Sequence, residues 1–145
     1  MSKLEDWAIF EEDVAEYLNG KRQAGSGNSC IAFKKGDIKS EEYLVECKCT
    51  GKDCYTLSSK TFGKIVNEAI NSFRIPLFAA RTKNSDYFVG LTLDFPYVEY
   101  KDEIDSVKSI KLDGRDSFLV KEFKVDNVPY QVVCWKVKLK EKLYD

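Results

Sequence analysis

The spacing of apolar residues alternates along the chain between helical and strand-like periods, and the order of these segments limits the folds that the chain can adopt. Apolar residues recur first at helical spacing, then in strand-like runs, then again at helical spacing, and then in strands. The run Leu77–Ala80 is apolar at every position, which is typical of a strand buried inside a sheet. This order predicts an α/β fold. The predicted elements are helix Glu5–Leu18, strands Ser29–Ile38 and Tyr43–Thr50, helix Ser58–Phe73, and strands Leu77–Ala80 and Tyr87–Leu93.

Turn residues separate these elements, and the chain becomes strand-rich towards its end. Asn19-Gly20 predicts the end of the first helix, Lys21–Asn28 predicts a glycine-rich loop with room for a short extended piece, and Lys39–Glu42 suits a hairpin turn. A length of 145 residues is that of one ordinary domain. We expect one domain at 1–145, with a core at about 5–93 and a β-rich extension at 94–145. The strands predicted in the extension are Val107–Leu112, Phe118–Val125 and Tyr130–Leu139.

Histidine is absent, and this limits the chemistry more than any other aspect of the composition. The usual general base and the usual zinc ligand are both missing, which excludes histidine-dependent nucleases and serine–histidine hydrolases. Hydrolysis would have to use carboxylates, lysine, a thiolate or a bound metal. The net charge of −1 argues only weakly against nucleic-acid binding, because it does not say where the charges lie.

The cysteines and the hydropathy pattern indicate the compartment. The five cysteines are an odd number in a chain that is 43% hydrophobic and can fold unaided, so we expect reduced thiols. No apolar run approaches the ~18 residues of a membrane span. The start, Met1–Asp6, lacks the apolar stretch of a secretory signal. We therefore expect a cytoplasmic protein, or one in the host cytoplasm if the chain is viral, with no membrane association.

A charged pair projects from one of the predicted strands. In Val45–Cys49, the alternation of a strand puts Glu46 and Lys48 on one face and the other three residues on the opposite, apolar face. Asp37 lies near the end of the neighbouring predicted strand, where a twisted hairpin could bring its carboxylate close to Glu46. Two close carboxylates repel unless a cation lies between them, and Mg²⁺ prefers such oxygen ligands. The alternative is an ordinary solvated strand face, with Asp37 in a turn after Gly36.

The arrangement resembles the PD-(D/E)XK nuclease superfamily, and within it the archaeal-type and phage Holliday junction resolvases. The resemblance covers roughly Trp7 to Leu93. It implies a restriction-endonuclease-like core, in which a central mixed β-sheet is flanked by helices in the order αβββαβ, followed here by a β-rich extension that exceeds the family's usual C-terminal region. The matching pieces, in order, are Phe10-Glu11, Arg22-Gln23-Ala24-Gly25-Ser26-Gly27, Gly36-Asp37-Ile38, Val45-Glu46-Cys47-Lys48, Ser58 to Ile65, and Ile75-Pro76-Leu77-Phe78-Ala79.

The resemblance also implies catalytic roles for individual residues. Asp37 and Glu46 would ligate Mg²⁺, for which Mn²⁺ should substitute, together with the backbone carbonyl of Cys47. Lys48 would be the catalytic lysine, which could orient or deprotonate water or stabilise charge on the phosphate. Glu11 would contact the metal through water. If the first helix is rotated, Glu12 or Glu16 would take that role, and a solvated acidic helix face is the alternative.

Four residues are expected to contact DNA. Arg22 can hold a phosphate, and Ser26 can donate a hydrogen bond from a loop whose glycines allow close approach. Lys60 matches a basic residue that resolvases place near the scissile phosphate, at a helix N-terminus that attracts anions. Lys64 would touch a further phosphate. The alternatives without a role in DNA binding are a flexible turn for the glycine-rich loop and ordinary solvated side chains for the lysines.

Together these expectations describe a magnesium-dependent DNA endonuclease of recombination and repair, of cellular or phage origin. We expect a homodimer acting on four-way junctions, because a junction presents two equivalent scissile phosphates and each chain offers one site. The alternatives are a restriction-like, repair or replication nuclease with another DNA target, and a catalytically idle DNA-binding module. Cys47, Cys49 and Cys54 could instead bind zinc or an iron–sulfur cluster, although the shared face of Cys47 and Cys49 favours burial in the core without metal.

Overall fold

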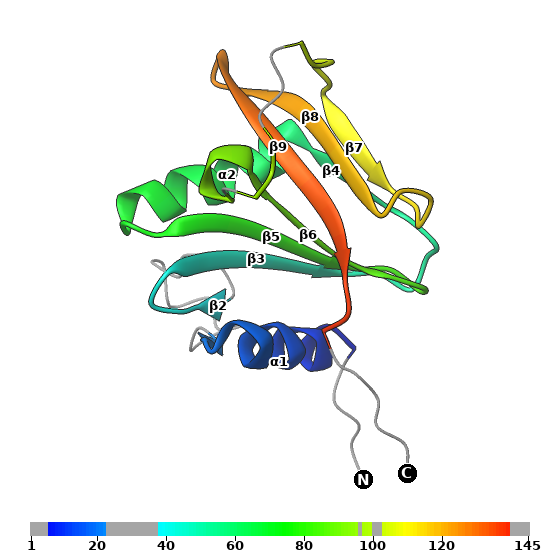
Figure 1. Cartoon of the computed structure of the whole chain (residues 1–145). Helices are drawn as coiled ribbons and strands as arrows, with labels where there is room; N and C mark the ends of the chain where they lie inside the picture. Colours follow the sequence, from blue (N-terminus) through cyan, green and yellow to red (C-terminus); the bar gives the residue numbers. More distant parts are fainter. Residues whose placement is uncertain (1–5, 23–37, 96, 100–102, 140–145) are drawn as a thin grey trace, which may run out of the picture.

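A mixed sheet with a helix on each face forms the centre of the molecule (Figure 1). The computed structural model describes residues 6–22, 38–95, 97–99 and 103–139. This confirms the predicted α/β class with a central mixed sheet flanked by helices. The elements are α1 Asp6–Leu18, β1 Lys21–Arg22, β2 Ile38–Lys39, β3 Tyr43–Cys49, β4 Tyr55–Ser58, α2 Ser59–Asn71, β5 Ile75–Arg81, β6 Asp86–Leu91, the 3₁₀ turn Thr92–Asp94, β7 Ser109–Leu112, β8 Phe118–Val125 and β9 Val128–Val137.

The seven strands of the central sheet follow the order β1-β2-β3-β5-β6-β9-β8, while β4 and β7 form a separate two-stranded sheet. β3 and β5 are parallel and are connected through β4 and α2, and the other neighbouring pairs are antiparallel. The predicted β-rich extension therefore contributes two strands, β8 and β9, to the same sheet as β3. No helix within the described residues is long and apolar enough to cross a membrane.

Helix α1 covers one face of the sheet with fewer apolar contacts than its sequence pattern predicts. Phe10 and Val14 are fully buried, and they pack against Val45 and Leu77. The acidic residues Glu11 and Asp13 are buried and occupy part of the inward face of the helix. Three apolar residues of the helix are exposed, namely Trp7, Ile9 and Tyr17. The predicted stop at Asn19-Gly20 is present, since the N–H of Gly20 donates to the carbonyl of Ala15 and Asn19 adopts a positive φ of 54°.

Helix α2 packs on the other face and is the more strongly amphipathic of the two. Ser58 caps it by accepting a hydrogen bond from the N–H of Thr61, so the helix begins at Ser59, one residue later than predicted. Phe73 was expected on the apolar face. It lies beyond the end of the helix with φ 58° and is 95% exposed, because the chain has already turned towards β5.

Helix α2 approaches the C-terminal hairpin closely. A Cβ built on Gly63 would lie 2.6 Å from Cγ1 of Val125 on β8, so any larger residue at this position would push the helix and strand apart. Phe62 and Phe123 pack ring to ring beside this contact, with centroids 5.8 Å apart. The N-terminal half of α2 is therefore positioned by β8.

Several strand boundaries differ from the prediction, and one strand was missed. β4 has four residues and pairs with β7, a partner more than fifty positions away in the sequence, so local periodicity does not predict it. Of the predicted strand at 29–38, only its last residue lies within the described residues. β7 begins two residues later than predicted, and β9 begins and ends two residues earlier. β6 ends at Leu91, where the 3₁₀ turn begins.

Candidate active site

The alternation predicted for β3 is present in the structure. Val45 and Cys47 are buried in the cluster beneath α1, while Leu44 belongs to the core beneath α2. Glu46 and Lys48 share the α2 face, and the distance from Glu46 Oε2 to Lys48 Nζ is 4.0 Å. The side chain of Glu46 is 17% exposed and that of Lys48 is 49% exposed. The carboxylate of Glu46 is therefore mostly shielded from solvent, whereas the ammonium of Lys48 lies at the protein surface.

The neighbouring strand leaves different amounts of space beside these two residues. Glu46 is paired with Phe78 of β5, and Lys48 is paired with Ala80. Ala80 has only a methyl group, so β5 leaves room beside the lysine stem. Phe78 in turn stacks against Tyr55 of β4, with ring centroids 5.7 Å apart and an angle of 22° between the rings. Burial raises the pKa of Tyr55, and the negative charge of Glu46 raises it further.

Tyr55 is not among the site residues predicted from the sequence. It belongs to the missed strand β4, and nothing in its local sequence distinguishes it from a core tyrosine. Its strand pairs with β7, and its side chain packs against the core beneath α2.

Two of the predicted site residues, Asp37 and Ser26, lie outside the described residues. The predicted hairpin before β3 is present where the structure describes it, since Ile38 pairs with Val45 and Lys39 pairs with Leu44 in antiparallel register. The turn is closed by the N–H of Ser40, which donates to the carbonyl of Tyr43.

Glu11 and Arg22 were predicted to contact a metal and a phosphate separately, and the structure brings them together. Arg22 Nε donates to Glu11 Oε1 at 2.9 Å, and the side chain of Glu11 is only 7% exposed. Arg22 also lies 3.8 Å from Glu12 and over the ring of Trp7. The helix rotation makes Glu11 the inward-facing glutamate, because Glu12 and Glu16 are exposed.

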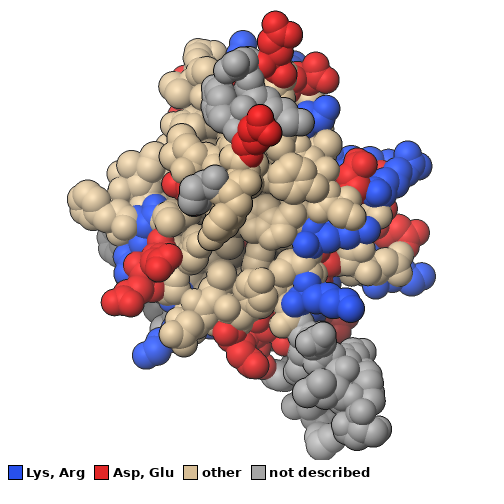
Figure 2. All heavy atoms as spheres, viewed as in Figure 1, with Lys and Arg blue, Asp and Glu red and all other residues tan. Residues whose placement is uncertain are grey.

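The lysines expected to contact DNA lie on the first turns of α2. Lys60 and Lys64 are both exposed, and their spacing of four residues puts them on one face of the helix. Figure 2 shows basic side chains gathered along the right-hand side of the molecule and interspersed with acidic ones. The basic residues thus do not form an uninterrupted patch in that view.

The cysteines within the described residues are free thiols. Cys47 is buried as predicted, but Cys49 is only half-buried, because it is the last residue of β3 and lies at the border of the α1 cluster. Among the described residues, no group of three or more His, Cys, Asp or Glu side chains is arranged to hold a metal ion. The prediction that Cys47 and Cys49 bind no metal stays a prediction.

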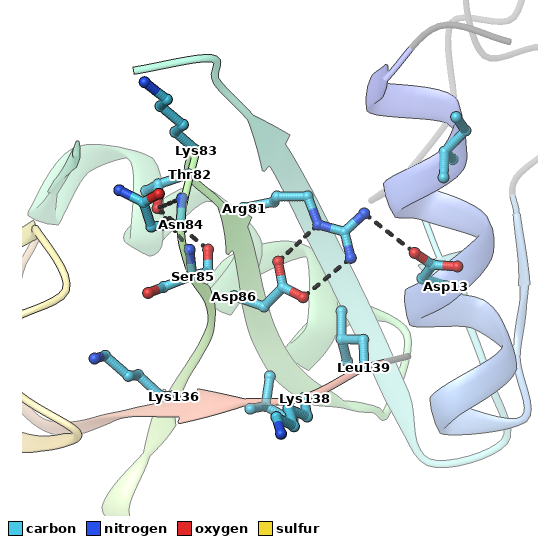
Figure 3. A pocket seen from close by; sticks show the side chains of 12 residues that line it. Asp13, Arg81, Thr82, Lys83, Asn84, Ser85, Asp86, Lys136, Lys138 and Leu139 are labelled. Atoms are coloured by element: carbon cyan, nitrogen blue, oxygen red, sulfur yellow. Dashed lines mark hydrogen bonds and ion pairs between the residues drawn. The ribbon is translucent and has the colours of Figure 1, made fainter. Parts of the chain in front are cut away.

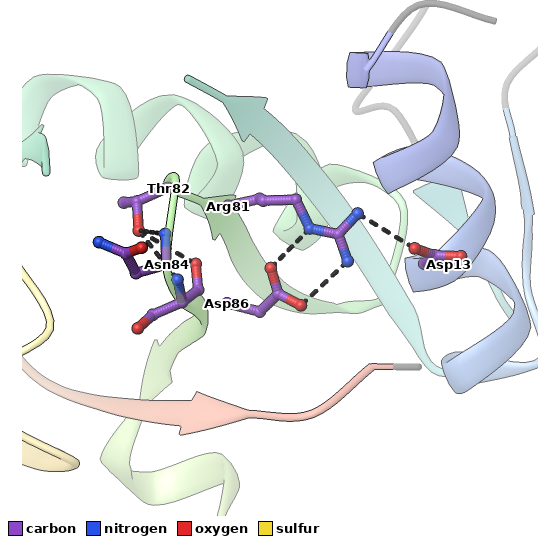
Figure 4. Close-up of polar contacts among 6 residues, drawn as sticks. Asp13, Arg81, Thr82, Asn84 and Asp86 are labelled. Atoms are coloured by element: carbon purple, nitrogen blue, oxygen red, sulfur yellow. Dashed lines mark hydrogen bonds and ion pairs between the residues drawn. The ribbon is translucent and has the colours of Figure 1, made fainter. Parts of the chain in front are cut away.

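A pocket of about 790 Å³ lies away from Glu46 and Lys48, between α1, the β5–β6 turn and the end of β9 (Figure 3). Its central polar group is already bonded: Arg81 donates from Nε and Nη2 to Asp86 at 2.7 and 3.0 Å, and Nη1 lies 3.1 Å from Asp13 (Figure 4). The guanidinium also lies over the ring of Phe10. We interpret this network as the connection between α1 and the sheet, since its arginine is occupied by two carboxylates.

No protein-family model matches the sequence, and no curated protein matches it significantly. Among solved structures, the chain is similar to Hjc, a Holliday junction resolvase from the archaeal hyperthermophile Archaeoglobus fulgidus, with a TM-score of 0.47 and 18% sequence identity. The similarity covers 76% of this chain and 85% of that chain. A likeness of this degree carries no conclusion about activity, which has to be argued from the residues themselves.

Proposed function

We propose that the protein is a Mg²⁺-dependent DNA endonuclease that hydrolyses phosphodiester bonds. One observation carries the proposal: Glu46 and Lys48 project side by side from an interior strand, 4.0 Å apart, with the carboxylate largely buried and the ammonium half exposed. The partly buried carboxylate of Glu46 can be a ligand for a metal ion, and the exposed ammonium of Lys48 can contact a phosphate. Metal-dependent phosphodiester hydrolysis can use the two groups together when they lie next to each other.

The donor set suits Mg²⁺ better than zinc. Mg²⁺ takes one or two carboxylates and keeps several waters, whereas a zinc site needs three or four protein ligands. Glu46 would be one carboxylate, with the backbone carbonyl of Cys47 as a further ligand. Asp37 would be the second carboxylate. It precedes Ile38 in the sequence, and Ile38 pairs with Val45, the residue before Glu46. When bound, the metal supplies Lewis acidity towards the phosphate and the attacking water.

The remaining residues of the site bind and orient. Lys48 would donate to a non-bridging oxygen of the scissile phosphate and stabilise the charge that develops there. The contact of Glu11 with a water molecule at the metal stays a prediction, because Glu11 lies on α1, which covers the face of the sheet opposite to Glu46 and Lys48, and is paired there with Arg22. Arg22 is about a third exposed and has N–H groups beyond those bonded to Glu11, so it can also hold a phosphate.

The finer proposal concerns the substrate. We propose that the protein cuts four-way DNA junctions as a two-fold symmetric homodimer, with Arg22, Ser26, Lys60 and Lys64 contacting phosphates. Recognition would rest on branch shape, because contacts to phosphates position DNA without reading its sequence. Mn²⁺ would replace Mg²⁺, because both take oxygen ligands in octahedral geometry.

Cleavage assays on matched DNAs test the proposal. Wild-type protein and Glu46→Gln would be incubated with four-way, nicked, flapped and linear DNA of the same sequence, in Mg²⁺, Mn²⁺ or Ca²⁺. We expect cleavage in Mg²⁺ and Mn²⁺ and a loss of at least about 100-fold in Glu46→Gln, which lacks a metal ligand. Binding of DNA should persist in the variant, because the change removes a negative charge that faces phosphate.

Two outcomes would contradict the proposal at different levels. Retention of more than about a tenth of the wild-type rate by Glu46→Gln would remove Glu46 from the metal site, since a lost ligand should cost several kcal/mol. Equal cleavage of linear and four-way DNA, or a monomer by light scattering at assay concentration, would end the junction assignment and leave a general nuclease.

A further inference from the structure

One row of paired residues crosses the sheet from the candidate site to a lysine of the last strand. The row runs from β3 through β5 and β6 to β9, and its members are Lys48, Ala80, Tyr87 and Lys136. Residues paired in this way have their side chains on the same face of a sheet, so Lys48 and Lys136 share a face. Neighbouring strands lie roughly 4.8 Å apart, which puts the backbones of the two lysines about 14 Å apart.

Lys136 also lines the pocket beside the Arg81 network, and two further lysines border that pocket. Lys83 lies in the β5–β6 turn and Lys138 follows β9; both are exposed, and neither forms an ion pair with a described residue. Lys136 Nζ donates to the carbonyl of Gly114 at 2.6 Å, which leaves two of its three N–H groups for other acceptors. Figure 3 shows Lys83 on one side of the pocket and the other two lysines on the opposite side.

The loop after β3 extends this set of lysines towards the candidate site. The N–H of Lys83 donates to the carbonyl of Lys52 at 2.8 Å, and Lys52 is exposed. Lys52, Lys83, Lys136 and Lys138 are called the lysine band below. β3 and β5 run towards the right-hand side of Figure 1, which is the side where Figure 2 shows basic side chains. Separate ammonium groups in a row suit a chain of phosphates better than one small anion, which needs donors that converge.

The carboxylates that line the pocket do not cancel the charge of the band. They are Asp13 and Asp86, and Arg81 binds both of them. Asp53 lies at the margin, where its carboxylate is exposed and accepts a hydrogen bond from the amide of Asn84 at 3.3 Å. Positive charge is therefore in excess at this end of the sheet, although the whole chain has a net charge of −1.

We propose that the lysine band is a second phosphate-binding site, which holds the DNA backbone beside the candidate active site. Each DNA strand has one phosphate about every 3.4 Å along the helix axis, so about 14 Å corresponds to about four nucleotides. While Lys48 contacts the scissile phosphate, the band would hold phosphates a few nucleotides away and fix the direction of the duplex without reading its sequence. The inference rests on the proposed function in one respect, namely that the protein binds DNA.

The test compares two double variants that each remove two positive charges. Lys83→Met with Lys138→Met changes the band, and Lys121→Met with Lys124→Met changes β8. Lys136 is left intact, because its bond to Gly114 also holds the structure together. Binding of duplex DNA would be measured by fluorescence anisotropy at several salt concentrations, without divalent ions, so that no DNA is cut. Thermal midpoints of both variants would show that they are folded.

We expect the band variant to bind DNA at least about 10-fold more weakly at low salt. The slope of log affinity against log salt should become less steep by about 2, since each lost phosphate contact removes about 0.9 from it. The β8 variant should keep the slope of wild type. It has the same net charge as the band variant, so it controls for attraction at long range.

The outcomes separate this inference from the proposed function. Equal slopes in the two variants would overturn the role of the band, even if the protein cuts DNA. A smaller slope in the band variant, in a protein that cuts no DNA when Mg²⁺ is added, would support the band and remove the nuclease assignment. Absence of DNA binding by wild type would overturn the inference outright.

Discussion

Two strands of the central sheet carry the same Glu-x-Lys pattern. β3 contains Glu46 and Lys48, and β8 contains Glu122 and Lys124. In both, the glutamate is half-buried, the residue between is buried and the lysine is exposed. β3 lies inside the sheet between β2 and β5, whereas β8 is its outermost strand. The sequence pattern and its alternation are therefore identical, and the surroundings differ.

The surroundings decide what each pair can do. Glu46 lies beside Phe78, interacts with Tyr55 and has Lys48 within 4.0 Å. Glu122 is paired with Gln131, and Lys124 is paired with Pro129 next to the β8–β9 turn. The spacing alone is thus a weak predictor of a site. Position within the sheet supplies the aromatic neighbour of Glu46, Phe78 of β5.

The largest expected effect concerns the framework that holds β3 against α1. Arg81 is paired with Cys49 at the end of β3 and binds the buried Asp13 and the half-buried Asp86. Arg81→Met should lower the free energy of unfolding by about 3 kcal/mol, because it leaves two carboxylates without their partner. Urea denaturation measures this value.

The matched change on the β8 side is Lys121→Met. Lys121 Nζ lies 3.6 Å from Asp105, whose side chain is 85% exposed, so its loss should cost less than about 0.5 kcal/mol. Equal destabilisation by the two substitutions would contradict the different roles that we assign to the two ion pairs.

The second prediction compares the lysines of the two patterns. Lys48→Met should reduce DNA cleavage by about 100-fold, the loss expected for one donor to a developing charge. Lys124→Met should leave the rate within about two-fold of wild type, because no step uses it. Neither change should alter the thermal midpoint appreciably, since both side chains are exposed. Similar activity in the two variants would remove the distinction between the strands.

The smallest expected effect concerns the buried thiol of Cys134 on β9, the strand next to β8. Cys134 is paired with Leu119 of β8, and burial raises its pKa to about 12. The unfolded thiol ionises near pH 8.5, so the unfolded state loses a proton that the folded state keeps. Stability from this group is complete below about pH 8.5 and falls as pH rises towards 12, by at most about 1.4 kcal/mol per pH unit.

Urea midpoints at pH 7.5, 9 and 10 test this dependence, with Cys134→Ala as the control that should lose stability more slowly over the same interval. Parallel decline in both proteins would show that other groups cause the alkaline loss. Cys49, half-buried at the end of β3, offers a comparison of reactivity, because it should alkylate faster than Cys134.

The sequence predicted those features that depend on local periodicity. The alternation of β3 separated Glu46 and Lys48 from Cys47, and the helical spacing of α2 located its buried face. Burial of Phe10 and Val14 on α1 followed from the same principle. Each of these features needs only the period of one element and an apolar partner.

The features that were missed depend on contacts between distant segments. Asp13 is buried on α1 because Arg81, 68 positions later, supplies the opposite charge. The ion pair of Glu11 with Arg22 and the position of Tyr55 likewise arise from tertiary packing. A single sequence carries no local sign of such partners, since each residue alone has the composition of an ordinary surface or core position.

The strand order of the sheet has a consequence for how the chain can be divided. β6 lies between β5 and β9, and β4 has its partner in β7, so both elements are completed only by residues after Asp94. A chain that stops near residue 93 would leave β6, buried at five of its six positions, as an open apolar edge able to pair with other chains. During synthesis the same edge is exposed until β9 has emerged, so the last third of the chain protects the first two thirds from aggregation.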